Sequence, residues 1–432
     1  MLSPPEADLV RRDGVLPGLA TVLDPEALLA ALAPVFPTAD VRAASIRYVR
    51  YKPHTNCLVA YRLDVDGTES QAVDVHAKVH RLDAPEKLGK ARQDAHVPGQ
   101  LGPGRIVLED RGLVVWVFPN DLRLRTVRRL ADGNARARLL RRLFPDRPEL
   151  WAGTLRTLRY KPERRYVAQL ETAGAAQAVL KVHAAPRYQR AAASAAAFCS
   201  RAPLRVPRVL GRSDSRGIVA LEWLPGRLLG AVLSEGAAAL DAVTAVGAAL
   251  GALHSQRDAC VPAIGRGTEV AALFALAADL GFLCPDLARP ARELAAQLAA
   301  RLAQTSPELR PIHGDFYADQ VLLSGASVAI FDIDQAALGD PAADLGTFTA
   351  HLERDALGGG PPAERVPVLR TALLEGYRAA TGRPASPPPP GVDLHTAVGL
   401  FRLAPEPFRA REPDWPQRIA AILARAATAA AG

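Results

Sequence analysis

Two aspartates, Asp315 and Asp332, lie on either side of a predicted hairpin in the segment 311–345, PIHGDFYADQVLLSGASVAIFDIDQAALGDPAADL. Short apolar runs on both sides of a turn at 324–326 predict the two strands, so the hairpin ends would bring the two carboxylates together. Phosphoryl transfer requires one carboxylate to orient and deprotonate an acceptor hydroxyl, and another to hold magnesium against the phosphates. The pattern therefore predicts these two roles for Asp315 and Asp332.

The same segment resembles the paired motifs HGDxxxxN and IDxxxxxxGDPxxDL of the aminoglycoside phosphotransferase and choline kinase superfamily. The resemblance covers roughly residues 150–430. It implies a bilobal, protein-kinase-like α+β fold, with a β-rich nucleotide lobe and a mostly helical second lobe. It also implies ATP and Mg²⁺ as cofactors and a hydroxyl group as the phosphoryl acceptor.

Carried over position by position, the resemblance implies that Asp315 is the catalytic base and that His313 braces its loop. Asp332 is implied as the metal ligand, and Asp334 is a second candidate. Gln320 takes the place of the family's magnesium-binding Asn, so an extra methylene must be accommodated within the octahedral geometry that magnesium demands.

Two further aspartates, Asp340 and Asp344, belong to the GDPAADL part of the motif. Both are expected to be structural, and Asp344 is expected to bond backbone groups of the catalytic loop. His254, in the predicted helix before that loop, is expected to be a packed or capping histidine.

The nucleotide lobe is expected to bind ATP through three features. Lys181, in the predicted strand AVLKVH, takes the position of the family's phosphate-binding lysine. The segment LEWLPG resembles the inter-lobe hinge, where the backbone of Glu222, Trp223 and Leu224 would bond the adenine edge. The turn KPERRYV contains no GxGxxG, and its cations, among them Arg164 and Arg165, are expected to replace backbone N–H groups there.

One expected partner is missing, because no acidic residue occurs between Lys181 and Pro207. The family's lysine usually pairs with a glutamate on the following helix. The sequence leaves three alternatives for Lys181: Gln189, Asp332, or a carboxylate from the N-terminal part of the chain.

An internal repeat marks the first half of the chain: IRYVRYKP at 46–53 recurs as LRTLRYKP at 155–162. Each copy continues with alternating apolar and polar residues, passes a turn at Gly67 or Gly174, and reaches a Lys-Val-His triplet. Both copies therefore predict three strands, a helix and two strands.

This pattern predicts three modules. Residues 1–150 form an N-terminal cap that resembles a degenerate nucleotide lobe and serves as a cap or as the contact of a homodimer. Residues 151–225 form the nucleotide lobe, and residues 226–432 form the helical lobe, in which the proline-rich segment 386–391 is a loop or spacer.

Charge and composition exclude several classes of protein. The net charge is +8, and its excess lies in residues 151–225, with 13 Lys and Arg against 4 Asp and Glu. Only 5% of residues are aromatic and they are not interleaved with the basic ones, which argues against nucleic-acid binding. Four scattered cysteines predict neither a zinc site nor disulfides. No signal peptide or long apolar run is present, so a cytoplasmic protein without membrane contact is expected.

The leading interpretation is a kinase that phosphorylates a hydroxyl of a small molecule, such as an antibiotic, a sugar or an amino alcohol. A kinase for Ser or Thr of a peptide in natural-product biosynthesis is an alternative. Gln320 and the missing helix glutamate also leave open a nucleotide-binding pseudokinase scaffold without turnover.

Overall fold

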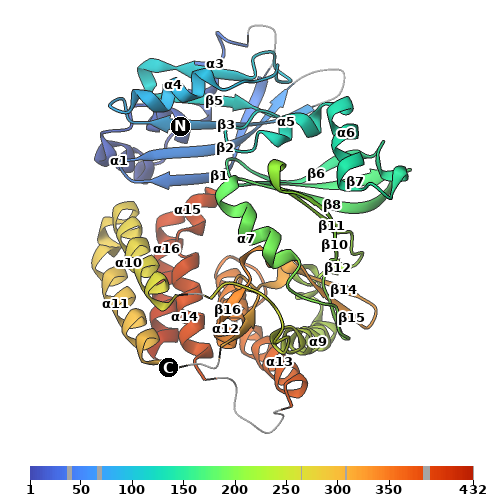
Figure 1. The fold of residues 1–432 in the computed structure, drawn as a ribbon. Coiled ribbons are helices and arrows are strands. Elements are labelled where there is room, and N and C mark those ends of the chain that lie inside the picture. Colours follow the sequence, from blue (N-terminus) through green and yellow to red (C-terminus); the bar gives the residue numbers. More distant parts are fainter. Residues whose placement is uncertain (37–40, 66–70, 264, 307–308, 383–389, 432) are drawn as a thin grey trace.

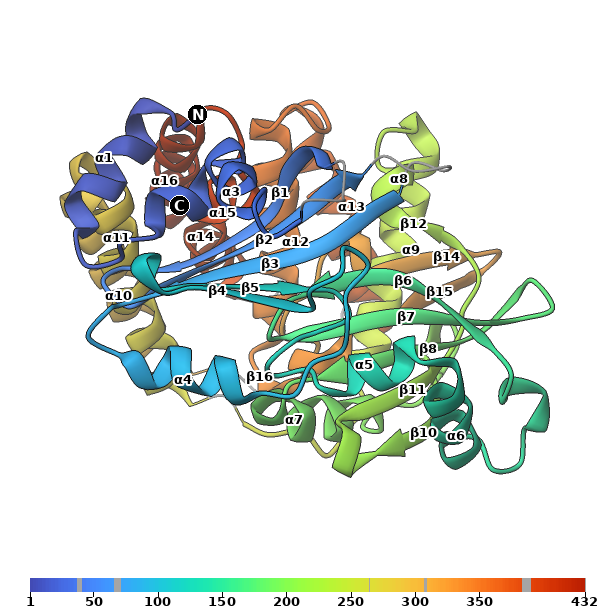
Figure 2. The same ribbon diagram turned by 90° about the horizontal axis from the view of Figure 1, so that it is seen from above.

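The computed structural model describes residues 1–36, 41–65, 71–263, 265–306, 309–382 and 390–431. The predicted turn at Gly67 and most of the proline-rich segment 386–391 lie outside these residues. Figures 1 and 2 show two β-sheets side by side, placed over a layer of helices. Within the described residues no helix is both long and apolar enough to cross a bilayer.

The first sheet is antiparallel and has the strand order β1-β2-β3-β5-β4. Three short helices precede it, and one helix lies between β3 and β4. The elements are α1 (Pro4–Asp13), α2 (Leu19–Leu23), α3 (Pro25–Leu32), β1 (Val41–Lys52), β2 (Asn56–Val65), β3 (Gln71–His80), α4 (Pro85–Gln93), β4 (Arg105–Leu108), η1 (Glu109–Arg111) and β5 (Leu113–Val117).

The second sheet has the equivalent order, β6-β7-β8-β11-β10, and is also antiparallel. The elements are α5 (Thr126–Ala131), α6 (Gly133–Leu143), η2 (Pro148–Leu150), β6 (Thr154–Lys161), β7 (Arg165–Thr172), β8 (Ala175–His183), α7 (Ala185–Ala195), β10 (Val209–Ser213), η3 (Asp214–Arg216) and β11 (Ile218–Glu222). The duplication predicted from the sequence is therefore present in the fold.

The two sheets also repeat a backbone detail. Gly112 and Gly217 end the short helices before the last strand with φ of +57° and +64°. A Cβ at either position would lie 2.5 or 2.7 Å from the carbonyl oxygen of His80 or His183. Only glycine fits such a left-handed, closely approached position, so both copies close the strand junction in the same way.

Packing extends the repeat beyond the strands. Helix α4 packs on one face of the first sheet, as α7 does on the second. On the opposite faces, α1–α3 cover the first sheet and α5–α6 cover the second. The predicted module boundaries at residues 150 and 225 stay a prediction, and this packing favours an earlier first boundary, before α5.

The rest of the chain is mostly helical and contains a small four-stranded sheet, of order β12-β14-β15-β9, and a two-stranded pairing of β13 with β16. Its helices are α8 (Leu229–Val232), α9 (Gly236–His254), α10 (Arg266–Leu283), η4 (Pro285–Leu287), α11 (Ala288–Gln304), η5 (Ala318–Gln320), η6 (Ile333–Gln335), α12 (Pro341–Leu357), α13 (Arg365–Ala380), α14 (Val392–Leu403), α15 (Glu406–Ala410) and α16 (Trp415–Ala431). Its strands are β12 (Arg227–Leu228), β13 (Arg310–Ile312), β14 (Val321–Ser324), β15 (Ser327–Ile330) and β16 (Ala337–Gly339), and β9 (Leu204–Arg205) pairs with β15. The whole is the expected α+β, kinase-like arrangement with an additional N-terminal sheet.

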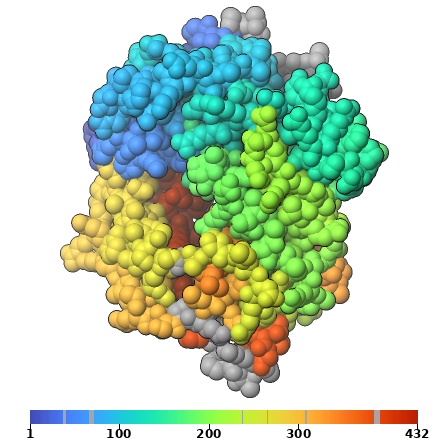
Figure 3. Space-filling view, in the orientation of Figure 1, coloured from blue at the N-terminus to red at the C-terminus, as the bar shows by residue number. Residues whose placement is uncertain are grey.

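The first sheet shares a continuous apolar core with helices α10, α11, α14, α15 and α16. At this junction the ring of Tyr51 lies 6.2 Å from each of the rings of Phe282 and Phe408. Arg411 donates a hydrogen bond of 3.1 Å to the carbonyl of Leu23. Figure 3 shows the N-terminal part resting directly on these helices, with a hollow between α10 and α7. This part of the first sheet is thus covered by the chain itself, and the homodimer stays a prediction.

Replacing Phe408 with Ala tests this shared core. Phe408 is 2% exposed and contacts both Tyr51 and Trp415, so we expect a loss of about 3–5 kcal/mol in the free energy of unfolding. Urea unfolding measures the loss, and limited proteolysis should cut the first sheet and α16 at the same urea concentration. Phe274→Ala is the control, since Phe274 on α10 is 46% exposed; equal stabilities of the two variants would contradict the shared core.

Candidate active site

The loop that carries Asp315 is fixed by a buried carboxylate from the start of α12. Asp344 is 1% exposed, and its two oxygens accept hydrogen bonds from the amides of His313 (2.6 Å) and Gly314 (2.8 Å). His254, also buried, bonds the same carboxylate at 3.0 Å through Nε2. The predicted role of Asp344 as a backbone anchor agrees with these contacts, and His254 is packed as expected.

Gly314 allows the loop to turn sharply at this point. Its φ is +83°, and a Cβ there would lie 2.3 Å from the carbonyl oxygen of Gln335. The close approach joins the loop of Asp315 to the segment that carries Asp332 and Asp334. A side chain at this position would force the two loops apart.

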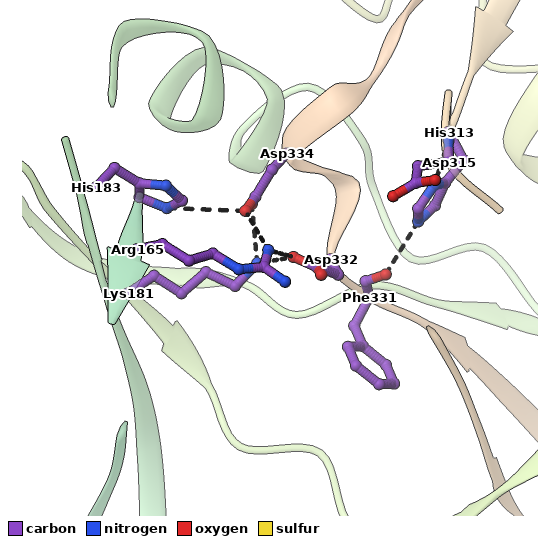
Figure 4. Close-up of polar contacts among 8 residues, drawn as sticks. All are labelled: Arg165, Lys181, His183, His313, Asp315, Phe331, Asp332 and Asp334. Atoms are coloured by element: carbon purple, nitrogen blue, oxygen red, sulfur yellow. Dashed lines mark hydrogen bonds and ion pairs between the residues drawn. The ribbon is translucent and has the colours of Figure 1, made fainter. Parts of the chain in front are cut away.

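His313 links the two loops a second time. Its Nδ1 accepts a hydrogen bond of 3.3 Å from the amide of Asp315, so Nε2 carries the proton and donates to the carbonyl of Phe331 at 3.0 Å (Figure 4). His313 is completely buried and therefore positions Asp315 without facing the solvent. This geometry supports its predicted role as a brace.

Asp332 and Asp334 form a compact charge cluster with two cations of the second sheet. Lys181 Nζ lies 2.6 Å from Asp332 Oδ1 and 2.8 Å from Asp334 Oδ1. Arg165 donates to Asp332 Oδ1 at 2.7 Å and to Asp334 Oδ2 at 3.1 Å. Figure 4 shows the two basic side chains reaching the aspartates side by side. Asp332 adopts a left-handed φ of +63°, which Asp tolerates better than most residues.

Asp315, the predicted base, and Asp332, the predicted metal ligand, have opposite pKa shifts. The surrounding protein removes part of the water around the Asp315 carboxyl and so raises its pKa. The negative charge of Asp332 raises it further. Burial also acts on Asp332, but Lys181 and Arg165 outweigh it and hold the pKa of that carboxyl well below its usual range. Paired carboxylates whose environments separate their pKa values are typical of acid–base sites. Asp315, the solvent-accessible one, is suited to accept a proton.

Of the three alternatives for the partner of Lys181, the structure shows Asp332. Asp334 is a second partner. Gln189 is exposed on α7 and is not that partner. Helix α7 instead holds the aspartate segment through Arg190, which donates a hydrogen bond of 2.6 Å to the carbonyl of Gln335. The helix that usually carries a glutamate thus carries a cation, and the lysine obtains its carboxylates from the other lobe.

The remaining predicted nucleotide-binding residues do not lie together in the structure. The Arg164 guanidinium lies 5.9 Å from the ring centroid of Tyr48, in the first sheet, whereas Arg165 belongs to the aspartate cluster. Glu222 ends β11, and its amide donates to the carbonyl of Arg208 at 2.8 Å. Trp223 and Leu224 follow in an irregular link to β12, between the two lobes.

The donor set fits magnesium. Gln320 is 3% exposed, and its side-chain oxygen has no hydrogen-bond partner among the described residues. Its backbone bonds Phe331 at 3.1 Å, directly before Asp332. Two carboxylates and an amide oxygen are the hard ligands that Mg²⁺ takes, with waters and phosphate oxygens completing the octahedron. No group of three or more His, Cys, Asp or Glu side chains that could hold a metal ion occurs within the described ranges, so a magnesium site here would need the amide oxygen of Gln320 as well as water and phosphate oxygens.

Residues 158–387 match the phosphotransferase enzyme family, a span of more than half the chain that includes the whole charge cluster. The chain belongs to this family. No curated protein matches the chain. The matched region contains the His-Gly-Asp loop and the GDPAADL segment, and the N-terminal sheet precedes it.

Solved structures of similar fold include two choline kinase relatives and an aminoglycoside phosphotransferase. The choline/ethanolamine kinase family protein from Mesorhizobium loti is 17% identical, with a TM-score of 0.47 over 69% of this chain and 94% of that one. Choline kinase from Cryptosporidium parvum is 11% identical, with a TM-score of 0.48 over 69% and 95%. A thermostable aminoglycoside phosphotransferase mutant, in a ternary complex with ADP and hygromycin B, is 12% identical, with a TM-score of 0.46 over 66% and 96%.

Two contributors to the site were missed by sequence reasoning. Arg190 gave no signal, because a lone arginine on an exposed-looking helix does not predict a contact with a distant backbone carbonyl. His183 lies 3.8 Å from Asp334, and burial lowers its pKa to about 4, so it is neutral there. The only feature of the sequence that pointed to His183 was the repeated Lys-Val-His triplet.

Replacing Asp315 with Asn should raise the melting temperature at pH 8. A folded-state pKa above the unfolded value means that ionised Asp315 opposes folding at high pH, and this penalty disappears below about pH 4. We expect a gain on the order of 1–2 °C at pH 8 that shrinks toward pH 4, measured by thermal melts across this range. The exposed Asp258 supplies the control Asp258→Asn; an equal or lower melting temperature of Asp315→Asn at pH 8 would argue against the raised pKa.

Proposed function

We propose that this protein is an ATP- and Mg²⁺-dependent phosphotransferase that transfers the γ-phosphoryl group to a hydroxyl of a small molecule. The observation that carries the proposal is the joint arrangement of two loops. One presents Asp315, accessible and with a raised pKa, and the other presents Asp332 between two cations. Family membership gives the reaction class, and the arrangement assigns roles within it.

Asp315 acts as the base. It accepts the proton of the acceptor hydroxyl while the new O–P bond forms and the bond from the γ-phosphorus to the ADP oxygen breaks. A raised pKa makes the carboxylate a stronger base near neutral pH. Its loop does not have to reorganise during the reaction, because His313 and Asp344 hold it in place.

Lys181 and Arg165 bind the phosphates and counter the charge that develops on their oxygens. Both are already held at the junction of the lobes by Asp332 and Asp334. Magnesium, held by Asp332, Asp334 and Gln320, would neutralise phosphate charge. The backbone of Glu222, Trp223 and Leu224 is proposed to bond the adenine, and Arg164 adds positive charge to the phosphate-facing turn.

The acceptor is proposed to bind in a cavity of about 930 Å³ next to the catalytic loop. Tyr317, two residues after Asp315, lines it and stacks on His351 with ring centroids 4.2 Å apart. This volume suits a small molecule and favours it over a peptide acceptor. The carboxylate of Asp319 also lines the cavity, which suits an acceptor with amine as well as hydroxyl groups.

The Asp315→Asn variant should lose turnover by a factor of about 10² to 10⁴ and keep its affinity for ATP. Transfer is followed with [γ-³²P]ATP and a panel of choline, hygromycin B and sugars, and ATP affinity by calorimetry. Asp258→Asn is the control and should match the wild-type chain.

Two outcomes would count against this proposal. Unchanged turnover of Asp315→Asn would show that Asp315 is not the catalytic base. A wild-type chain that binds ATP and magnesium but phosphorylates no member of the panel and no Ser- or Thr-containing peptide would instead support a nucleotide-binding scaffold.

Filling the cavity should weaken acceptor binding alone. Ala421 on α16 lines the cavity, so Ala421→Trp is expected to raise the KM of the acceptor that the panel identifies by about tenfold, on the order of the 1.4 kcal/mol that a lost contact costs. The KM of ATP should stay unchanged. Ala427→Trp, at an exposed position of the same helix, is the control; an increase in the KM of ATP alone would place the acceptor elsewhere.

A further inference from the structure

The first sheet has a lysine, Lys78, at the position that Lys181 holds in the second sheet. Lys78 Nζ lies 2.8 Å from both carboxylate oxygens of Glu163, which belongs to the turn between β6 and β7. Arg50, on β1, lies 2.6 Å from the same carboxylate. Glu163 is only 4% exposed, so the first sheet holds the phosphate-facing turn of the second through a buried ion pair.

The backbone of the same turn is held by a second group of the first module. Asp121 is completely buried, and its Oδ2 accepts hydrogen bonds from the amide of Glu163 at 2.8 Å and from the Tyr160 hydroxyl at 2.9 Å. Its Oδ1 accepts from the amides of Arg123 and Leu124, both at 2.8 Å. Glu163 also has a left-handed φ of +58°, and these bonds hold it in that uncommon conformation.

These contacts determine which way the turn presents its charges. The carboxylate of Glu163 points into the first module, whereas Arg165, two residues later, reaches Asp332 and Asp334 in the other lobe. The turn is closed by a bond of 3.0 Å from the Arg164 amide to the carbonyl of Lys161. The turn therefore holds the carboxylate of Glu163 away from the aspartate cluster and the guanidinium of Arg165 toward it.

The ion pair is maintained at neutral pH. Burial alone would raise the pKa of Glu163, but Lys78 and Arg50 lower it to about 2. A buried charge of this kind is costly unless it is paired, so loss of Lys78 leaves Glu163 with one partner. The turn would then gain freedom to move or to draw Arg165 away from the phosphate site.

We propose that Lys78 and Glu163 are positioning residues through which the N-terminal module holds the phosphate-binding turn 161–165 ready for the nucleotide. The inference rests on the proposed function, because it assigns the ordered turn to ATP. A turn that lacks the GxGxxG backbone donors must present its cations in one conformation, and fixing them before binding removes that entropic cost from the binding step.

Calorimetric titration of the full-length chain with ATP and with adenosine separates positioning from general stability. In Lys78→Met and Glu163→Gln we expect the Kd of ATP to rise by about tenfold, which corresponds to about 1.4 kcal/mol. The Kd of adenosine should stay unchanged, because adenosine contacts only the hinge side of the site. Lys78→Arg keeps the charge and should restore most of the ATP affinity.

Asp94→Asn is the matched control. Asp94 is a buried carboxylate of the same module, 9% exposed, and lies 2.8 Å from Arg125 and 3.5 Å from Arg128. It resembles Glu163 in burial and in its two cationic partners, but it does not touch the turn. Its replacement should lower the melting temperature and leave both Kd values unchanged.

The outcomes separate this inference from the proposed function. Equal losses of ATP and adenosine affinity in Lys78→Met, or no loss of either, would overturn the positioning role while the wild-type chain still transfers phosphate. A loss of ATP affinity in Asp94→Asn as large as in Glu163→Gln would overturn it as well. A wild-type chain that binds no ATP would end both proposals.

Discussion

Buried negative charge is the constraint on which the site depends. Asp332 and Asp334 lie between the lobes, where carboxylates are stable as anions only if cations contact them directly. Lys181 and Arg165 supply those contacts from the second sheet. The two lobes are therefore held together by the same groups that are proposed to receive the nucleotide, and the phosphates and magnesium would take over interactions that already exist within the chain.

The same constraint explains the departure on α7. Because Lys181 obtains two carboxylates from the aspartate segment, a glutamate on the helix is not needed to stabilise it. Arg190 instead secures the backbone next to those carboxylates, which keeps the pair within reach of the lysine. The charge on the helix is reversed, yet the outcome is the same: the lysine and the aspartates are held at hydrogen-bond distance.

The sequence predicted the features whose residues are close together along the chain. The repeat and the order of strands along the chain follow from local spacing and turn signals, whereas the anchoring of the catalytic loop by Asp344, 31 residues after His313, was expected from the family resemblance. The contact between Lys78 and Glu163 spans 85 residues and depends on how the two sheets are placed beside each other, which alternation and turn signals do not specify. For the same reason the sequence does not show that α5 and α6 pack on the second sheet, and the boundary at residue 150 stays a prediction.

The N-terminal sheet touches both halves of the enzyme-like core: Glu163 of the second sheet, and Phe282 and Phe408 of the helical part. In a protein whose lobes are joined by a single link, they can swing apart freely. Here the first sheet contacts both parts, so we expect this second connection to limit how far they can move apart. Ligand selection in such a molecule would depend more on fit to the existing site than on closure of the lobes around the ligand.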